Sequence, residues 1–138
     1  MVSASINPKT VSPAAPPAIC EEVLRDPRYP VHQIADRLLP YLRVLIEQFR
    51  PQQVILFGSY AYGHPDMHSD VDLIIVKEVE ESVLKDKIRI RRAWRNMPRR
   101  ELLLPFDLIL VSPERHRERL NHAAGFYDEI VHRGLVLV

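Results

Sequence analysis

Apolar residues recur along the chain in two patterns, one typical of helices and one typical of buried strands. Over residues 31–49 they are spaced by three and four positions, which predicts one buried helical face. The residues of this face are Ile34, Leu38, Leu42, Leu45 and Phe49. Pro40 lies inside the segment, so we expect a kink there or two helices that meet there.

Short runs of β-branched, leucine and aromatic residues predict the strands. They cover Val54–Phe57, Val71–Val76 and Phe106–Val111, and Leu135–Val138 is a candidate last strand. Between the second and third runs, residues 82–97 carry a helical stripe of Val83, Lys87, Ile90 and Trp94, flanked by Leu84 and Ile88. Ser112-Pro113 is a helix start, followed by one or two helices up to Arg133. This order predicts an α/β (α+β) fold, a small mixed β-sheet with flanking helices.

The 138-residue length suits one domain, which we place at residues 31–138. Residues 1–30 are expected to be a largely flexible, proline-rich N-terminal tail with a short helix over Ile19–Arg25. Cys20 is the one cysteine, which excludes an intrachain disulfide and a cysteine-based zinc site. The sequence has no apolar run of membrane-spanning length and no secretion signal, so we expect a cytoplasmic protein with no membrane partner.

Charge is distributed unevenly although the net charge is only +1. Residues 85–100 hold eight basic residues and one acid, a local net charge of +7, so the rest of the chain sums to −6. The basic residues form the solvated face of a helix in one interpretation, with Trp94 in the core. In the other interpretation, these basic residues bind an acidic partner or nucleic acid, and nucleic acid is not favoured.

Three aspartates are candidate catalytic residues. Asp70 and Asp72 stand two positions apart at the start of a strand, so their side chains point to the same side. Their mutual repulsion and desolvation would be relieved by Mg²⁺, which prefers oxygen ligands. Asp107 occupies the third strand, and if that strand lies beside the second, three carboxylates converge that could hold a pair of metal ions for displacement at phosphorus.

A glycine turn precedes these aspartates. Gly58 directly follows a strand, Ser59 supplies a hydroxyl and a backbone N–H, and Tyr60-Ala61-Tyr62 can begin a helix. A strand, a Gly-Ser turn and a helix start form an anion site, because free N–H groups and the helix dipole face the ligand. A phosphate site beside a metal site is what nucleotide chemistry requires.

Together, Gly58-Ser59-x-Ala61-x-Gly63, Ser69-Asp70-x-Asp72-Leu73 and the distal Asp107 resemble the DNA polymerase β-like nucleotidyltransferase superfamily. More narrowly, residues 31–138 are similar to the MNT-type minimal nucleotidyltransferases. The resemblance implies that Gly58, Ser59 and Gly63 bind the nucleotide and that Asp70, Asp72 and Asp107 bind two Mg²⁺ ions. Tyr62 stands where this family often has a basic residue.

The same resemblance implies the activity: AMP transfer from ATP, with Asp107 accepting a proton or orienting the nucleophile. MNT proteins commonly act as antitoxins of a HEPN-domain toxin, and some adenylylate a tyrosine of that partner. The alternatives are a small-molecule, aminoglycoside-like nucleotidyltransferase and a non-catalytic antitoxin that acts by binding. Assembly with itself or with another chain is left open.

The remaining polar residues carry weaker signals. His64 and His68 flank Pro65 in the loop between the two motifs, where a zinc site is disfavoured, although His68 could approach the nucleotide. His116, His122 and His132 are expected on the surface. Of Tyr60 and Tyr62, one is expected to pack in the core and the other to contact the base or the acceptor.

Overall fold

One mixed sheet forms the centre of the protein, a computed structural model that describes residues 17–98, 103–121 and 125–138. Its strands have the order β3-β2-β1-β4. β1 (Gln53–Phe57) is antiparallel to β2 (Val71–Val76) and to β4 (Leu135–Val136), whereas β3 (Phe106–Val111) is parallel to β2. The predicted α/β class with a small mixed sheet is confirmed, and the bounds of β2 and β3 are those that the sequence predicts.

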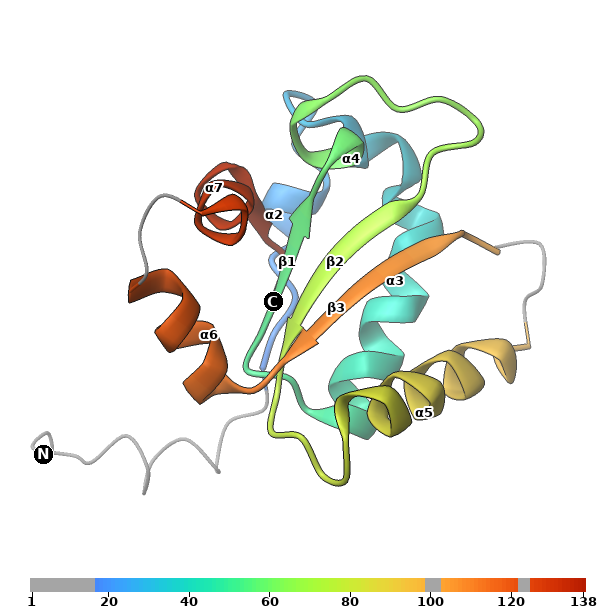
Figure 1. Ribbon diagram of the computed structural model, residues 1–138. Helices are drawn as coiled ribbons and strands as arrows, with labels where there is room; N and C mark the ends of the chain where they lie inside the picture. The colour runs from blue at the N-terminus through green and yellow to red at the C-terminus, as the bar shows by residue number, and fades with distance from the viewer. Residues whose placement is uncertain (1–16, 99–102, 122–124) are drawn as a thin grey trace, which may run out of the picture.

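Helices pack on both faces of the sheet (Figure 1). α3 (Ala35–Val44) and α5 (Val83–Arg95) cover one face, where Leu56, Leu73 and Leu108 join the larger core. α7 (Phe126–Arg133) covers part of the other face through Ile130, next to α6 (Pro113–Asn121). Two cores arise because successive strand residues point to opposite faces. None of the helices in the described ranges combines the length and apolar composition that a bilayer crossing requires.

The segment before β1 is one continuous series of helical turns. A 3₁₀ helix, η2 (Pro30–Ile34), leads into α3, and a π-helical turn, η3 (Leu45–Phe49), follows it. Pro40 lies inside α3, so of the two expected alternatives the division into two helices is wrong, and the kink stays a prediction. The helix tolerates the missing N–H of Pro40 because Leu38 and Leu42, on either side, are fully buried.

The N-terminal part of the described chain packs beside the last strand. The short helix predicted over Ile19–Arg25 is present as α2 (Glu21–Leu24), and Leu24 is fully buried. The Cys20 N–H donates a 2.7 Å hydrogen bond to the Leu137 carbonyl. The core therefore includes residues ahead of position 31, where the domain was expected to begin. The flexible tail was predicted over residues 1–30, of which residues 1–16 lie outside the described residues.

α5 buries fewer apolar residues than its sequence pattern predicts. Ile90 and Trp94 are buried, and the Trp94 indole N–H donates to the Tyr41 carbonyl at 3.1 Å. Val83, Leu84 and Ile88, in contrast, are 43%, 67% and 44% exposed. The inward position of this half of the helix is taken by Asp86 instead.

Asp86 forms a buried ion pair with Lys77, the residue directly after β2. The Lys77 ammonium lies 3.0 Å from Asp86 Oδ2, and these side chains are 4% and 2% exposed. Asp86 also accepts a hydrogen bond from the Glu80 N–H and contacts the Arg89 guanidinium. Burial acts to raise the pKa of the Asp86 carboxyl, but these hydrogen bonds and charges outweigh it and hold the pKa below its ordinary value. The pair fixes the start of α5 against the end of β2.

Replacing Asp86 with alanine should lower the free energy of unfolding by about 3–5 kcal/mol, because the buried Lys77 charge would lose its partner. Urea denaturation at neutral pH measures this loss. Glu81→Ala is the matched control, since Glu81 pairs with Lys85 on the surface of the same region and its loss should cost about 1 kcal/mol or less. Equal losses in the two variants would contradict the assigned role of Asp86.

Candidate active site

The chain turns sharply at Gly58, immediately after β1. Gly58 has φ +73°, and a Cβ atom built there would lie 2.1 Å from Asp72 Oδ2. The carbonyl of Gly58 accepts hydrogen bonds from the N–H groups of Ala61 and Tyr62, which start the four-residue helix α4 (Ser59–Tyr62). A residue without a side chain is therefore needed at this position for the Asp72 carboxylate to lie against the turn.

Gly63 supports the same turn from its other end. A Cβ atom on Gly63 would lie 2.8 Å from the Cα of Ser59, and the Gly63 N–H donates to the Ser59 carbonyl at 3.0 Å. The three residues predicted to bind the nucleotide, Gly58, Ser59 and Gly63, thus belong to one compact turn. Their contact with a phosphate stays a prediction.

The two tyrosines of α4 have different environments. Tyr60 is 8% exposed and belongs to the larger core, so the prediction that one of them packs in the core is confirmed. Tyr62 is half-buried, and the Arg133 guanidinium of α7 lies 4.1 Å from the centre of its ring. The positive charge of Arg133, near the C-terminal end of the chain, therefore stacks on the ring of Tyr62. Tyr62 occupies the position at which the family that the motif resembles often has a basic residue. Sequence spacing gave no signal for this contact.

The predicted neighbourhood of the aspartates is present in the sheet. Asp72 is paired across β2 and β3 with Asp107, and across β1 and β2 with Phe57, the residue before the glycine turn. Asp70 precedes β2 by one residue, which places it on the same side as Asp72. Burial first, then the charges of Asp107 and Asp70, raise the pKa of the Asp72 carboxyl to about 6. The three carboxylates are thus close enough to repel one another.

The loop between the turn and β2 is held by its own hydrogen bonds. The Asp66 N–H donates to Ser69 Oγ at 2.8 Å, and the His68 N–H donates to the Asp66 carboxylate at 2.8 Å. These bonds fix the chain just before Asp70. His64 and His68 are exposed, and a contact between His68 and a nucleotide stays a prediction.

Within the described ranges, no three side chains of His, Cys, Asp or Glu are arranged as a metal site. The donors at the start of β2 and β3 nevertheless fit Mg²⁺ by their chemistry. They are carboxylate oxygens, and burial, followed by the charges of Asp107 and Asp70, raises the pKa of Asp72 to about 6. A divalent cation would remove the repulsion among them, so among the described residues the chemistry of Asp70, Asp72 and Asp107 suits a magnesium ion, and its binding there stays a prediction.

One histidine is not where the sequence predicts. His116 was expected on the surface but is 8% exposed, and its Nδ1 forms a 2.5 Å hydrogen bond with the Tyr127 hydroxyl. Burial, followed by the Arg117 charge, lowers the pKa of His116. The contact joins α6 to α7, a pairing that local sequence does not encode. His132 is exposed as expected, and His122 lies outside the described residues.

Gly58→Ala should lower the free energy of unfolding by about 1–3 kcal/mol, because alanine is strained at this φ and its methyl group would displace the Asp72 carboxylate. Thermal or urea unfolding measures this loss of stability. Gly125→Ala is the control, since a Cβ atom there would have no neighbour within 4 Å among the described residues. Similar stability of the Gly58 variant and the wild type would contradict the close approach of Asp72.

Asp72→Asn should stabilise the metal-free protein at neutral pH. The folded-state pKa of about 6 exceeds the ordinary value of 3.8, so the folded state binds this proton more tightly and wild-type stability falls as the pH rises between the two values. Removing the charge should raise the free energy of unfolding by about 1 kcal/mol near pH 7, after allowance for solvent screening, and by nearly nothing near pH 4. Urea denaturation with a chelator present measures the free energy of unfolding at both pH values, and Glu114→Gln, at an exposed position, is the control. A less stable variant at neutral pH would contradict the crowding of the carboxylates.

Comparison with known proteins shows the family of the chain. The family model described as "Polymerase beta, Nucleotidyltransferase" matches residues 42–137, which include the glycine turn and all three aspartates. The chain is also 42% identical, over 84 residues, to the Methanocaldococcus jannaschii protein named "Putative protein adenylyltransferase MJ0141". That alignment covers 60% of this chain and 75% of the relative. The chain therefore belongs to the polymerase beta nucleotidyltransferase family.

Proposed function

We propose that this protein transfers AMP from ATP to a hydroxyl group of a partner protein, in a Mg²⁺-dependent reaction. The observation that carries the proposal is the register that pairs Asp72 with Asp107 beside the Gly58 turn. The likeness to a protein named as an adenylyltransferase supports AMP as the transferred group and a protein as the acceptor. The cytoplasm, where ATP is available, is the location we propose.

The roles follow from the position of each residue. Gly58, Ser59 and Gly63 would hold the triphosphate, because the turn presents backbone N–H groups at the end of a strand. Asp70, Asp72 and Asp107 would bind Mg²⁺, with two ions expected. Bound magnesium supplies neutralisation of the triphosphate charge and alignment of the attacking and leaving oxygens.

In the proposed step, the acceptor hydroxyl oxygen forms a bond to the α-phosphorus of ATP. The bond from that phosphorus to the oxygen bridging to the β-phosphate breaks, and pyrophosphate leaves with the electron pair. Asp107 accepts the hydroxyl proton or orients the hydroxyl, since it lies on β3, an edge strand of the described sheet, and is exposed. Its neighbour in the register, Asp72, is more buried and better placed for the metal.

The acceptor we propose is a tyrosine of a HEPN-domain toxin, with this chain as its antitoxin. The support is the resemblance of the whole residue pattern to the MNT-type enzymes. Asp70, Asp72 and Asp107 are all present, which favours catalysis over inhibition by binding alone.

Incubation with α-labelled ATP, Mg²⁺ and the candidate partner should add one or more AMP units to the partner, read by intact mass. Asp70→Asn, Asp72→Asn and Asp107→Asn should each lower transfer by about a hundredfold or more. Glu114→Gln, an exposed acid on α6, is the matched control and should keep wild-type activity. In the Asp107 variant, ATP binding should be retained, and undiminished turnover there would reject its role.

The alternatives give different results in the same assay. A label that appears on an aminoglycoside and not on protein would replace the protein acceptor with a small molecule. If the Asp70→Ala, Asp72→Ala double variant still neutralises the partner in cells, inhibition works through binding rather than modification. Loss of neutralisation in that variant is the result we expect.

A further inference from the structure

The basic helix α5 divides into two electrostatically different halves. In its first half, Lys85 pairs with Glu81, and Arg89 contacts Glu80, Glu81 and Asp86. In its second half, Arg91, Arg92 and Arg95 are exposed and, within the described part of the chain, form no ion pair with a carboxylate. Lys87 in the first half likewise forms no ion pair among the described residues, so the unpaired positive charge of α5 is concentrated in, but not confined to, its second half.

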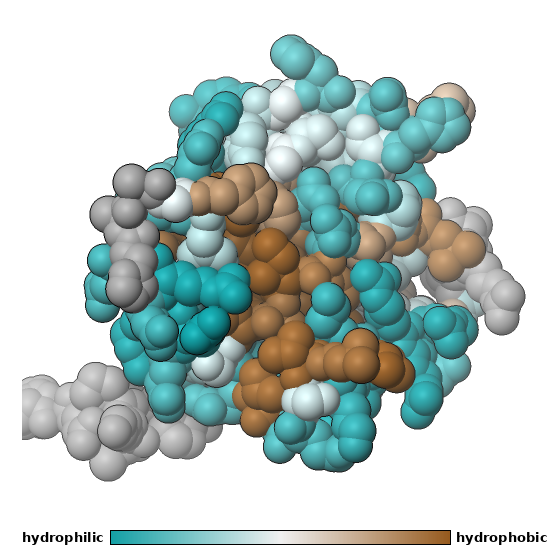
Figure 2. All heavy atoms as spheres, viewed as in Figure 1, coloured by the Kyte–Doolittle hydropathy of each residue, from teal (hydrophilic) through white to brown (hydrophobic). Residues whose placement is uncertain are grey.

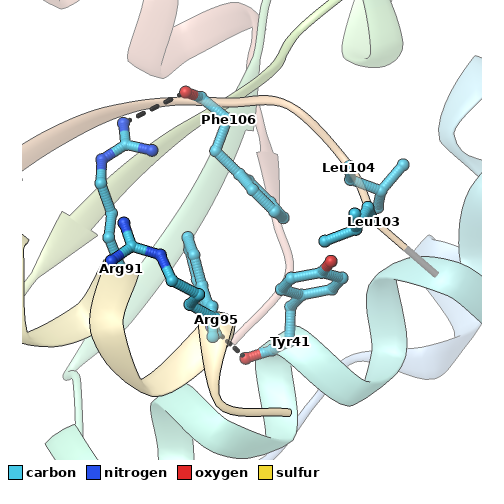
Figure 3. A pocket seen from close by; sticks show the side chains of 7 residues that line it. Tyr41, Arg91, Arg95, Leu103, Leu104 and Phe106 are labelled. Atoms are coloured by element: carbon cyan, nitrogen blue, oxygen red, sulfur yellow. Dashed lines mark hydrogen bonds between the residues drawn. The ribbon is translucent and has the colours of Figure 1, made fainter. Parts of the chain in front are cut away.

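A pocket of about 180 Å³ lies at this end of α5 (Figure 3). Arg91 and Arg95 border one side, Leu103 and Leu104 lie opposite, and Phe106 lies between the two sides. The Arg91 guanidinium donates to the Phe106 carbonyl at 3.2 Å, and the Arg37 guanidinium donates to the Leu103 carbonyl at 2.8 Å. The pocket thus combines an apolar interior with guanidinium groups at its rim.

Exposed apolar residues precede the two arginines of this pocket on the same face of α5. Leu84, Ile88, Arg91 and Arg95 are spaced by four, three and four positions, so they share one face of the helix. Leu84 and Ile88 are 67% and 44% exposed, and Leu103 at the pocket is 62% exposed. Figure 2 shows apolar surface gathered over the region of α5. Exposed apolar side chains bordered by charge are typical of protein-binding sites.

We propose that this docking surface, made of Leu84, Ile88, Arg91, Arg95 and the adjoining pocket, binds an acidic polypeptide segment that inserts an apolar or aromatic side chain. Carboxylates of the segment would pair with Arg91 and Arg95, and the inserted side chain would fill the pocket. This proposal rests on the proposed function in one respect: it takes the acidic segment to belong to the protein that receives AMP.

The position of the docking surface suits delivery of an acceptor. Phe106 and Asp107 are consecutive at the start of β3, so their side chains point to opposite faces of the sheet. β3 is one of the two edge strands of the described sheet. A segment anchored beside Phe106 therefore reaches the Asp107 side by passing one strand edge, a distance of a few residues of extended chain. The Phe106 carbonyl is already bonded to Arg91, so we expect anchoring by side chains rather than by strand addition.

The aromatic rings of the pocket favour a protein over a nucleic acid. Trp94 and Phe106 lie against each other with centroids 4.3 Å apart, and Tyr41 packs edge-on to Trp94 at 5.4 Å. Their faces are thus engaged with one another, whereas binding of single strands uses aromatic faces as stacking platforms for bases. Exposed leucine and isoleucine side chains along α5 likewise match an apolar partner rather than a phosphate backbone.

Binding can be measured on the full chain without nucleotide or metal, by fluorescence anisotropy of labelled poly(Glu,Tyr), with poly-Glu and poly(U) as comparison probes. We expect poly(Glu,Tyr) to bind most tightly. The Arg91→Gln, Arg95→Gln double variant should weaken its binding about tenfold or more, since charge-assisted contacts are lost. Leu103→Ser, a change at an exposed position, should remove the preference for poly(Glu,Tyr) over poly-Glu.

Lys85→Gln is the matched control, because it removes one charge of the same helix that is already paired, and it should change binding less than about twofold. Equal weakening by the control, or no weakening by the double variant, would overturn the proposal. So would tighter binding of poly(U) that is lost in the double variant, which would assign the surface to nucleic acid.

Transfer assays separate this proposal from the proposed function. With an AMP-accepting partner, the double variant should raise the KM for the partner and leave the KM for ATP unchanged. An unchanged KM for the partner would overturn the docking role while AMP transfer stands. If the wild type transfers no AMP but its binding of poly(Glu,Tyr) depends on Arg91 and Arg95, the proposed function fails and the docking surface stands.

Discussion

The parallel pairing of β2 with β3 is the constraint on which the rest of the site depends. Residues 71–76 and 106–111 are in continuous register, which sets Asp107 directly beside Asp72. A shift of one residue would turn Asp107 to the opposite face of the sheet, where α3 and α5 pack. The apolar residues of both strands resist such a shift, because Leu73, Ile75, Leu108 and Leu110 are all buried in the larger core. Packing on one face thus fixes the carboxylates on the other.

The connection between β2 and β3, which contains α5, adds a second structural constraint. α5 is held at its start by the buried Lys77–Asp86 pair and near its end by Trp94, which bonds to the Tyr41 carbonyl of α3. With its inward positions committed to these contacts, the helix presents leucine, isoleucine and arginine side chains outward. The same element that sets the register of β3 therefore also creates the apolar and basic surface beside it.

Much of this arrangement could be predicted from the sequence because its signals are local. The β-branched runs identify β2 and β3, Ser112-Pro113 identifies the start of α6, and the Asp-x-Asp spacing places two carboxylates on one side of a strand. The adjacency of Asp107 was a condition of the sequence argument, and the parallel pairing of β2 with β3 meets it, as the order strand, helix, strand typically does. The predicted Gly58 turn is present for the same reason, since a positive φ at a strand end is a local requirement.

The predictions that failed concern tertiary contacts. The exposure of Leu84 and Ile88 depends on Asp86 taking the inward position, which requires Lys77 from a different element. His116 is buried because α7 brings Tyr127 to it, and α3 continues through Pro40 because its neighbours are buried in the core. The stacking of Arg133 on Tyr62 joins residues 71 positions apart, beyond the reach of any spacing argument.

The central claim is that carboxylates from β2 and β3 bind one metal centre beside the Gly58 turn. Paramagnetic broadening by Mn²⁺, added in substoichiometric amounts to the isotope-labelled protein, tests it most directly by NMR. The account predicts that the backbone signals of Asp70, Asp72, Asp107 and Gly58 broaden first and together, and that excess Mg²⁺ restores them. Broadening confined to one strand, or centred on the His64–His68 loop, would contradict it.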